Sequence, residues 1–151
     1  MKNPIQYTFL EATPSQEEID SLNSLLKQIS ENSKQLTRQS ANNFLSHGGL
    51  MIMARNRESK TIIGFATIVL SVKINGTTGR IEHVVVDERY RGKGISLMIM
   101  KFLIDAARRN GTSRLDLTSS PARIAAKVLY QKLGFEKRDT NVYRLELQTV
   151  A

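Results

Sequence analysis

The stretch VVVDERYRGKGIS, residues 84–96, carries a run of valines into a glycine-containing turn that opens a helix. The valines predict a buried strand, and apolar residues recur at helical spacing after the turn. Backbone N–H groups at the start of a helix lack intrahelical partners and together carry about half a positive charge. Gly92 and Gly94 let the backbone approach a ligand closely, and Arg91 and Lys93 add two cations, so the turn is a candidate anion site.

An ordinary tight turn between a strand and a helix, with charges exposed to water, would show the same two glycines. The residues at these positions exclude two other types of phosphate-binding loop. The Walker pattern G-x-x-x-x-G-K-[ST] is not supplied by residues 92–96, and the dinucleotide pattern G-x-G-x-x-G fails because residue 97 is leucine. The glycines alone therefore leave open whether the turn binds a ligand, and which one.

The residues before this stretch predict a strand, one or two helices and then three strands joined by turns. Thr13 or Ser15 is the expected N-cap of the first helix, because two glutamates follow in its first turn. Gly64 indicates a kink or a bulge, and Asn75-Gly76 indicates a tight hairpin. The predicted strands cover residues 5–11, 50–55, 61–74 and 80–86, and a short second helix covers residues 41–45 after a loop at residues 30–40.

The residues after it alternate between helices and strands. One helix follows the turn and ends at Asn110-Gly111, and another starts at Pro121 and ends at Gly134. Strands are predicted at residues 114–118 and 142–147. A meander followed by strand–helix–strand–helix–strand predicts an α/β chain with a mixed sheet that is parallel in part.

Length and composition predict one globular domain over residues 1–151. A chain with 40% apolar and 24% charged residues, and no internal repeat or boundary, can bury a core of its own. The absence of cysteine excludes a disulfide scaffold, a thiolate zinc site and a cysteine nucleophile. Because the two histidines are far apart in the sequence, we expect no metal site.

The net charge of +8 is concentrated in one part of the chain, since residues 80–138 hold 13 basic and 6 acidic side chains. Such a field attracts polyanions, which include nucleic acid, acidic proteins and polyphosphate cofactors. A solvated surface that only keeps the protein soluble would give the same excess. Aromatic residues make up 6% of the chain and tryptophan is absent, which disfavours a stacking platform for single-stranded nucleic acid.

Neither a signal peptide nor a membrane span is indicated by the pattern of apolar residues. Polar residues interrupt the apolar ones near the start of the sequence, and no run approaches the roughly 18 apolar residues of a span. We therefore expect a cytoplasmic protein without a membrane partner.

Two motifs resemble those of a known family. Residues 89–94, Arg-Tyr-Arg-Gly-Lys-Gly, match the pattern [QR]-x-x-G-x-[GA] of the acetyl-CoA loop in the GNAT N-acetyltransferase superfamily. Residues 129–135 match the L-Y-x-K-x-G-F segment of the same family, and residues 81–86 resemble its fourth strand, nearest to the glucosamine-6-phosphate N-acetyltransferase type. His83 stands where that type commonly has aspartate. The resemblance covers residues 61–147 clearly and only the element order before residue 50.

The resemblance implies a fold and an activity. The fold is the GNAT acyl-CoA N-acyltransferase fold, with a mostly antiparallel sheet, a splay between parallel strands four and five, and about four helices. The activity is transfer of the acetyl group of acetyl-CoA to a primary amine, which attacks the thioester directly in a ternary complex. Dimers are common in the family, so a homodimer is possible.

The resemblance also implies which residues bind the cofactor. In the family, the splay exposes backbone groups of strand four to the pantetheine arm, and the loop binds the pyrophosphate through backbone N–H groups. Ser96 stands where the family usually has a small residue, and serine should still fit there. Arg123 stands where the family often has asparagine. Arg123 either contacts the CoA phosphates or the acceptor, or faces solvent. The cofactor-binding candidates are Val84, Val85, Val86, Arg91, Gly92, Lys93, Gly94, Ile95, Ser96 and Arg123.

Two residues are candidates for proton transfer. An alkylamine has a pKa near 10.4 and must lose a proton before it attacks, so a carboxylate acting directly or through water would help, and Glu82 is our first candidate. His83 would point to the opposite face if the strand is regular, and only one of the two would then face the site. Tyr130 matches the family's proton donor to the leaving thiolate. An ion-paired or solvent-facing Glu82, a partly buried structural His83 and a packing role for Tyr130 are the alternatives.

The acceptor amine is not identified by the sequence. Thr118, Ser119 and Ser120 are candidates to line its pocket, together with the predicted loop at residues 30–40. Glu31 is the one acidic residue in residues 30–47, which argues weakly against a polycationic acceptor. A CoA-binding regulatory module without catalysis is the alternative function, and a basic nucleic-acid-binding domain is a third that lacks a supporting motif.

Overall fold

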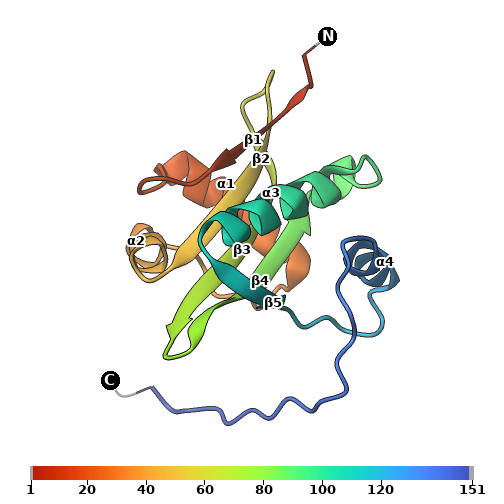
Figure 1. The fold of residues 1–151 in the computed structure, drawn as a ribbon. Coiled ribbons are helices and arrows are strands. Elements are labelled where there is room, and N and C mark those ends of the chain that lie inside the picture. Colours follow the sequence, from red (N-terminus) through yellow and green to blue (C-terminus); the bar gives the residue numbers. More distant parts are fainter. Residues whose placement is uncertain (1, 150–151) are drawn as a thin grey trace.

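The computed structural model describes residues 2–149, in which five strands form one sheet in the order β1-β2-β3-β4-β5 (Figure 1). Neighbouring strands run antiparallel except β4 and β5, which are parallel, and this confirms the predicted mixed sheet. The strands are β1 (Ile5–Phe9), β2 (Gly49–Asn56), β3 (Ile62–Lys73), β4 (Gly76–Val86) and β5 (Thr112–Asp116). The helices are α1 (Gln16–Ile29), α2 (Arg38–Ser46), η1 (Glu88–Tyr90, a short 3₁₀ helix), α3 (Ile95–Arg109) and α4 (Ile124–Lys132).

Capping side chains set where the first two helices begin. Ser15, one of the two predicted caps, starts α1, because its hydroxyl accepts from the Glu18 backbone N–H while the Glu18 carboxylate accepts from the Ser15 N–H. These bonds, more than the Arg55 guanidinium 2.8 Å away, hold the pKa of Glu18 below its ordinary value. Thr37 caps α2 in the same way, so α2 begins three residues before the predicted start.

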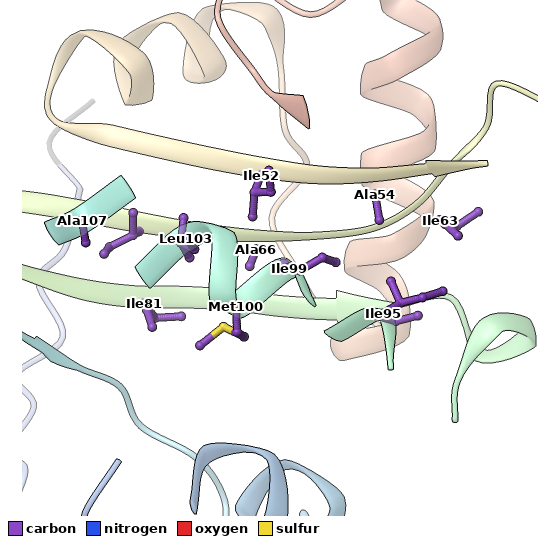
Figure 2. Packing of buried hydrophobic residues seen from close by; sticks show 12 residues of the cluster. Ile52, Ala54, Ile63, Ala66, Ile81, Ile95, Ile99, Met100, Leu103 and Ala107 are labelled. Carbon is purple, nitrogen blue, oxygen red and sulfur yellow. The ribbon is translucent and has the colours of Figure 1, made fainter. Parts of the chain in front are cut away.

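Helices cover both faces of the sheet. On β2, Met51 and Met53 point to a cluster that packs against α1, while Ile52 and Ala54 point to the opposite cluster, which packs against α3. Figure 2 shows the second cluster, in which the α3 side chains lie over the strands. Its α3 members are Ile95, Ile99, Met100, Leu103 and Ala107. The strand alternation therefore fixes α3, and with it the glycine turn, against one face of the sheet.

The central strands depart from regular pairing at two places. Ala54 pairs with Gly64 and Arg55 with Ile62, so a bulge lies next to the predicted irregularity at Gly64. A Cβ on Gly64 would lie 2.9 Å from the Val85 carbonyl oxygen, which explains the glycine. On the other side of β3, Thr67 pairs with His83 and Ile68 with Ile81, so Glu82 is the extra residue of a second bulge.

The C-terminal part differs from its prediction. Residues 121–123 form a turn, and α4 starts at Ile124 rather than at Pro121. The strand predicted at residues 142–147 is wrong, because these residues pair with no strand of the described chain. We call residues 136–149 the C-terminal arm; after α4 it continues as an irregular segment that joins no strand of the sheet (Figure 1). A strand needs a neighbour for its backbone hydrogen bonds, and the arm reaches none.

No helix in residues 2–149 combines the length and the apolarity needed to cross a membrane.

Candidate active site

Asp87 organises the turn between β4 and α3. It is buried, its backbone N–H donates to the Ile63 carbonyl at 2.7 Å, and its carboxylate accepts from the Arg89 backbone N–H at 3.0 Å and from Arg89 Nη2 at 2.9 Å. The hydrogen bonds from Arg89 hold the pKa of Asp87 below its ordinary value. Asp87 was not among the predicted site residues, although an acidic side chain directly after an apolar strand and two residues before an arginine is a usable signal.

The two glycines of the turn adopt the left-handed conformation, with φ of 76° at Gly92 and 77° at Gly94. A Cβ built on either would meet no atom within 4 Å, so the turn borders open space. Gly94 is the N-cap of α3 and supplies no side-chain hydrogen bond, whereas α1 and α2 both carry capping boxes. The first N–H groups of α3 therefore face an open cradle without a side-chain acceptor, which fits a bound phosphate.

The two basic side chains of the turn, Arg91 and Lys93, contact residues that precede the turn. Arg91 Nε donates to the Val86 carbonyl at 3.1 Å, and Lys93 Nζ lies 5.3 Å from the centre of the Tyr90 ring. The Tyr90 hydroxyl in turn accepts from Asn56 Nδ2 at 3.3 Å. These contacts hold both positive charges beside the open cradle.

The parallel strands β4 and β5 separate beyond their first residues. Their pairing in the described chain ends at Arg80 and Asp116, whereas β4 stays paired with β3 as far as Gly64 and Val86. The edge of β4 from residue 81 to residue 86 therefore has no β5 partner, as the splay in the expected fold requires. Val85 and Val86 bury their side chains in the core, as does Ile95, so these three residues offer only backbone groups to a ligand.

A cleft opens where the two strands separate, and we call it the β4–β5 cleft. It brings together six residues predicted for the site from three parts of the chain, but not Ser119 or Ser120. Glu82 and His83 both line it. The expectation that only one of them faces the site assumed a regular strand, and the bulge at Glu82 breaks the alternation on which it depended. The lining residues are Ile29, Ile81, Glu82, His83, Val84, Leu117, Thr118, Arg123 and Tyr130.

The Glu82 carboxylate is half-exposed and held by Arg80. Arg80 Nε lies 3.0 Å from Glu82 Oε1, and Arg80 Nη2 donates to Thr118 Oγ1 at 3.3 Å. The guanidinium thus links β4 to the segment after β5 at the mouth of the cleft. Glu82 is also the bulged residue of β4, and the Arg80 ion pair is the contact that holds its carboxylate in the described chain.

His83 is anchored by a neighbour on β3. Its Nδ1 lies 3.0 Å from the hydroxyl oxygen of buried Thr67, and its ring lies 6.3 Å from that of Phe65. Burial lowers the pKa of His83 below its ordinary value of 6.5, and the nearby Glu82 carboxylate opposes this only in part. The imidazole is therefore neutral at pH 7.

Acidification should destabilise the fold through His83. Because the folded-state pKa lies below 6.5, the unfolded chain takes up the proton first, and the free energy of unfolding falls as the pH drops below that value. Thermal melting between about pH 5 and about pH 7.5 should show a smaller loss of stability for His83→Asn than for the wild type. An equal loss of stability on acidification in the wild type and in His83→Asn would show that His83 is not its source.

Tyr130 reaches the cleft from α4. Its ring makes an edge contact with Phe135 at 5.9 Å, and its carbonyl accepts from the Phe135 N–H at 3.0 Å, so the end of α4 fixes the orientation of the phenol. Burial raises the pKa of Tyr130 above 10.0, and Arg123 opposes this in part. The phenol is therefore protonated at neutral pH and can donate a proton.

Helix α4, which carries Tyr130, is weakly anchored in the described chain. None of its residues is buried, its N-cap Arg123 makes no side-chain cap, and Ile124 and Val128 are exposed. Leu129 and Leu133 only partly bury themselves against the core.

Comparisons with known proteins give a consistent result. Residues 16–135 match the Acetyltransferase (GNAT) family. The chain is 32% identical over 91 residues to an uncharacterized N-acetyltransferase, YobR, of Bacillus subtilis (strain 168). This match covers 60% of this chain and 34% of that protein. It is 33% identical over 89 residues to the glucosamine 6-phosphate N-acetyltransferase of Trypanosoma brucei brucei. This match covers 57% of this chain and 58% of that protein. The chain thus matches less than two thirds of the length of either relative.

A crystal structure of a Trypanosoma brucei acetyltransferase shares the fold. It superposes with a TM-score of 0.77 at 25% sequence identity, over 95% of this chain and 99% of that one. The overall arrangement of the sheet and its helices is therefore one that a solved structure also has.

Proposed function

Because this chain belongs to the acetyltransferase (GNAT) family, we propose that it is a single-domain enzyme that transfers the acetyl group of acetyl-CoA to a primary amine by direct attack in a ternary complex. Family membership confirms the resemblance predicted from residues 89–94 and 129–135. The observation that carries the proposal is the β4–β5 cleft, which unites Glu82 and Tyr130 beside a strand edge that runs into the uncapped start of α3.

Backbone groups are proposed to hold most of the cofactor. The pyrophosphate fits the open N–H groups from residue 92 to residue 96, with Arg91 and Lys93 beside them. The pantetheine arm fits the unpaired edge of β4 at residues 84–86, and Arg123 offers a further cation at the cleft. Bound acetyl-CoA supplies the thioester whose carbonyl carbon the amine attacks.

Glu82 is proposed to act as the base, directly or through water. A protonated alkylamine with a pKa near 10.4 is almost fully charged at neutral pH and cannot attack. The Glu82 carboxylate takes up that proton at the mouth of the cleft, where Arg80 keeps it in place. His83 lies in the same cleft as a neutral imidazole and is the alternative route for the proton.

Tyr130 is proposed to protonate the leaving thiolate of CoA. A free thiol has a pKa near 8.5, so its departure as a thiolate is favoured when a donor is at hand. The phenol of Tyr130 keeps its proton because burial raises its pKa, and it reaches the cleft opposite the β4 edge. A CoA-binding module without catalysis would have no use for an acid and a base in one cleft.

The acetyl-transfer reaction can be tested with a panel of amines. Purified protein with acetyl-CoA should release free CoA thiol only when an amine is added, and the panel should include an amino sugar phosphate, amino acids, peptides and polyamines. Acetyl-CoA binding without amine-dependent thiol release across the panel would favour the non-catalytic alternative.

Glu82→Gln serves as the internal test of the base. We expect turnover to fall by about 100-fold, because general-base catalysis is typically worth at least that factor, while acetyl-CoA binding stays unchanged. Glu58→Gln is the matched control, since Glu58 is an exposed carboxylate in the β2–β3 turn. Equal turnover of Glu82→Gln and Glu58→Gln would remove Glu82 from the base role.

A further inference from the structure

A buried hydroxyl holds the His83 ring in the β4–β5 cleft. Thr67 lies on β3 with only 4% of its surface exposed, and its Oγ1 lies 3.0 Å from His83 Nδ1. Within residues 2–149 this hydroxyl has no other hydrogen-bond partner. The other ring nitrogen, Nε2, likewise has no partner in that part of the chain, and His83 lines the cleft. Nε2 is therefore the nitrogen that a bound molecule can reach.

The Thr67 hydroxyl decides which ring nitrogen carries the proton. Because burial lowers the pKa of His83, the ring is neutral at pH 7 and holds one proton, on Nδ1 or on Nε2. A proton on Nδ1 would make the Thr67 oxygen the acceptor, and the buried O–H would then have no partner of its own. A buried donor without an acceptor costs the full desolvation of that group, whereas a hydroxyl that donates to Nδ1 satisfies both groups. Thr67 therefore donates to Nδ1, and the proton of His83 lies on Nε2.

The sheet itself builds the contact between Thr67 and His83. The two residues lie directly opposite each other in the register of β3 and β4. A half-turn of the ring would place a carbon instead of Nδ1 beside the hydroxyl, which would again leave the O–H unpaired. The buried Phe65 ring, 6.3 Å away between centres, restricts the imidazole from another side. Both the orientation and the tautomer of His83 are thus set by β3.

An Nε2–H group in the cleft donates a hydrogen bond and accepts no proton. A route in which His83 takes the proton of the amine needs a free lone pair on Nε2, and this tautomer has none. The proton then goes to Glu82, the neighbour of His83 in the same cleft. Consecutive Cα atoms lie about 3.8 Å apart, so an amine held at Glu82 has atoms two or three bonds away beside His83. A group at that place pairs with Nε2–H when it carries an oxygen.

The contact therefore bears on the choice of substrate as well as on proton transfer. We propose that Thr67 is a positioning residue that holds His83 as the Nε2–H tautomer, and that His83 selects amines with a hydroxyl two or three bonds from the nitrogen. The choice of acceptor rests on the proposed acetyl transfer, whereas the tautomer does not. The two parts are therefore tested by separate measurements.

Nitrogen NMR of the imidazole rings tests the tautomer without any measurement of activity. The chain has two histidines, so a His47→Gln variant leaves the signals of His83 alone. An ordinary imidazole has a pKa near 6.5, so spectra at about pH 8 report neutral rings. Long-range proton–nitrogen correlations distinguish the protonated nitrogen from the one with a lone pair. We expect the proton on Nε2 and a hydrogen-bonded lone pair on Nδ1. A proton on Nδ1 would overturn the proposal.

Two substitutions of Thr67 separate its hydroxyl from its packing. Thr67→Val keeps the volume of the side chain and loses the hydroxyl, whereas Thr67→Ser keeps the hydroxyl and loses a methyl group. In the His47→Gln chain, the Nδ1 signal should move to that of an unbonded nitrogen in Thr67→Val and stay in place in Thr67→Ser. An equal displacement in both variants would mean that packing holds the ring, and Thr67 would lose its positioning role.

Two amines of equal size test the acceptor class. Ethanolamine carries a hydroxyl where propylamine carries a methyl group, which leaves Nε2–H without an acceptor. This predicts a preference of about 10-fold in kcat/KM for ethanolamine. Thr67→Ser should keep the preference and Thr67→Val should lose most of it. Equal kcat/KM for the two amines in the wild type would overturn the acceptor class. Failure of every amine to be acetylated, beside an Nε2–H signal, would contradict the proposed function and support the tautomer.

Discussion

Replacement of Gly94 by glutamate should abolish acetyl-CoA binding while the chain still folds. The new carboxylate would sit at the N-cap of α3 and accept the N–H groups that are open to a phosphate. Its charge would also repel the pyrophosphate. Each hydrogen bond to a charged group is worth about 1.5–3 kcal/mol, so the loss of two predicts an affinity drop of at least ~100-fold. Isothermal titration of acetyl-CoA into the variant measures this drop.

Gly111→Glu is the control for Gly94→Glu. Gly111 follows the other end of α3, has φ of 73°, and likewise has no atom within 4 Å of a built Cβ. A non-glycine residue in this conformation costs about 1–2 kcal/mol at either site, so both variants should melt at lower temperature than the wild type. Only Gly94→Glu should lose acetyl-CoA. Wild-type affinity in Gly94→Glu, or equal weakening in both variants, would contradict the assignment of the turn.

Tyr130→Phe should lower turnover far more than it weakens acetyl-CoA binding. The substitution keeps the ring that contacts Phe135 and removes only the hydroxyl. General-acid catalysis typically contributes at least about 100-fold, so we expect kcat to fall by about that factor with the cofactor affinity nearly unchanged. The raised pKa of Tyr130 means that the wild-type phenol stays protonated up to at least its ordinary value of 10.0. Steady-state rates under conditions where chemistry limits turnover measure the effect.

Tyr7→Phe is the matched control for Tyr130→Phe. Burial also raises the pKa of Tyr7, but its ring stacks on Phe102 of α3, outside the β4–β5 cleft. We expect its turnover to stay near that of the wild type. A Tyr130→Phe rate equal to the Tyr7→Phe rate at every pH would leave Tyr130 with a packing role alone.

The sheet and its helices could be predicted because local signals and burial agree there. The alternation along β2 and the helical spacing along α3 each mark a buried face, and Asn75-Gly76 fixes one hairpin. Such signals are local in sequence. Element ends depended on side-chain caps, as Thr37 shows: it starts α2 before the apolar pattern begins.

The predicted strand at residues 142–147 fails for a physical reason. The residues do alternate between apolar and polar, but a strand forms only beside a neighbouring strand. An alternating pattern does not say which sheet edge the segment would join, or whether that edge belongs to the same chain.

The structure brings several of the predicted site residues together, while their roles stay a prediction. Glu82, Val84, Arg123 and Tyr130 line one cleft. His83 lines the cleft together with Glu82 because β4 has a bulge at Glu82. No single residue type in the sequence predicts such a bulge. The anchoring roles of Asp87 and Thr67 depend on contacts with Arg89 and His83 that form only in the folded turn and sheet.

The measurement that most directly tests the central claim is a calorimetric titration of acetyl-CoA into the wild-type chain at two salt concentrations. We predict one site per chain with micromolar affinity that weakens as salt is added, because backbone N–H groups and basic side chains bind the phosphates. No detectable binding at low salt would mean that the open start of α3 is only a turn, and it would contradict an acetyl-CoA-dependent transferase.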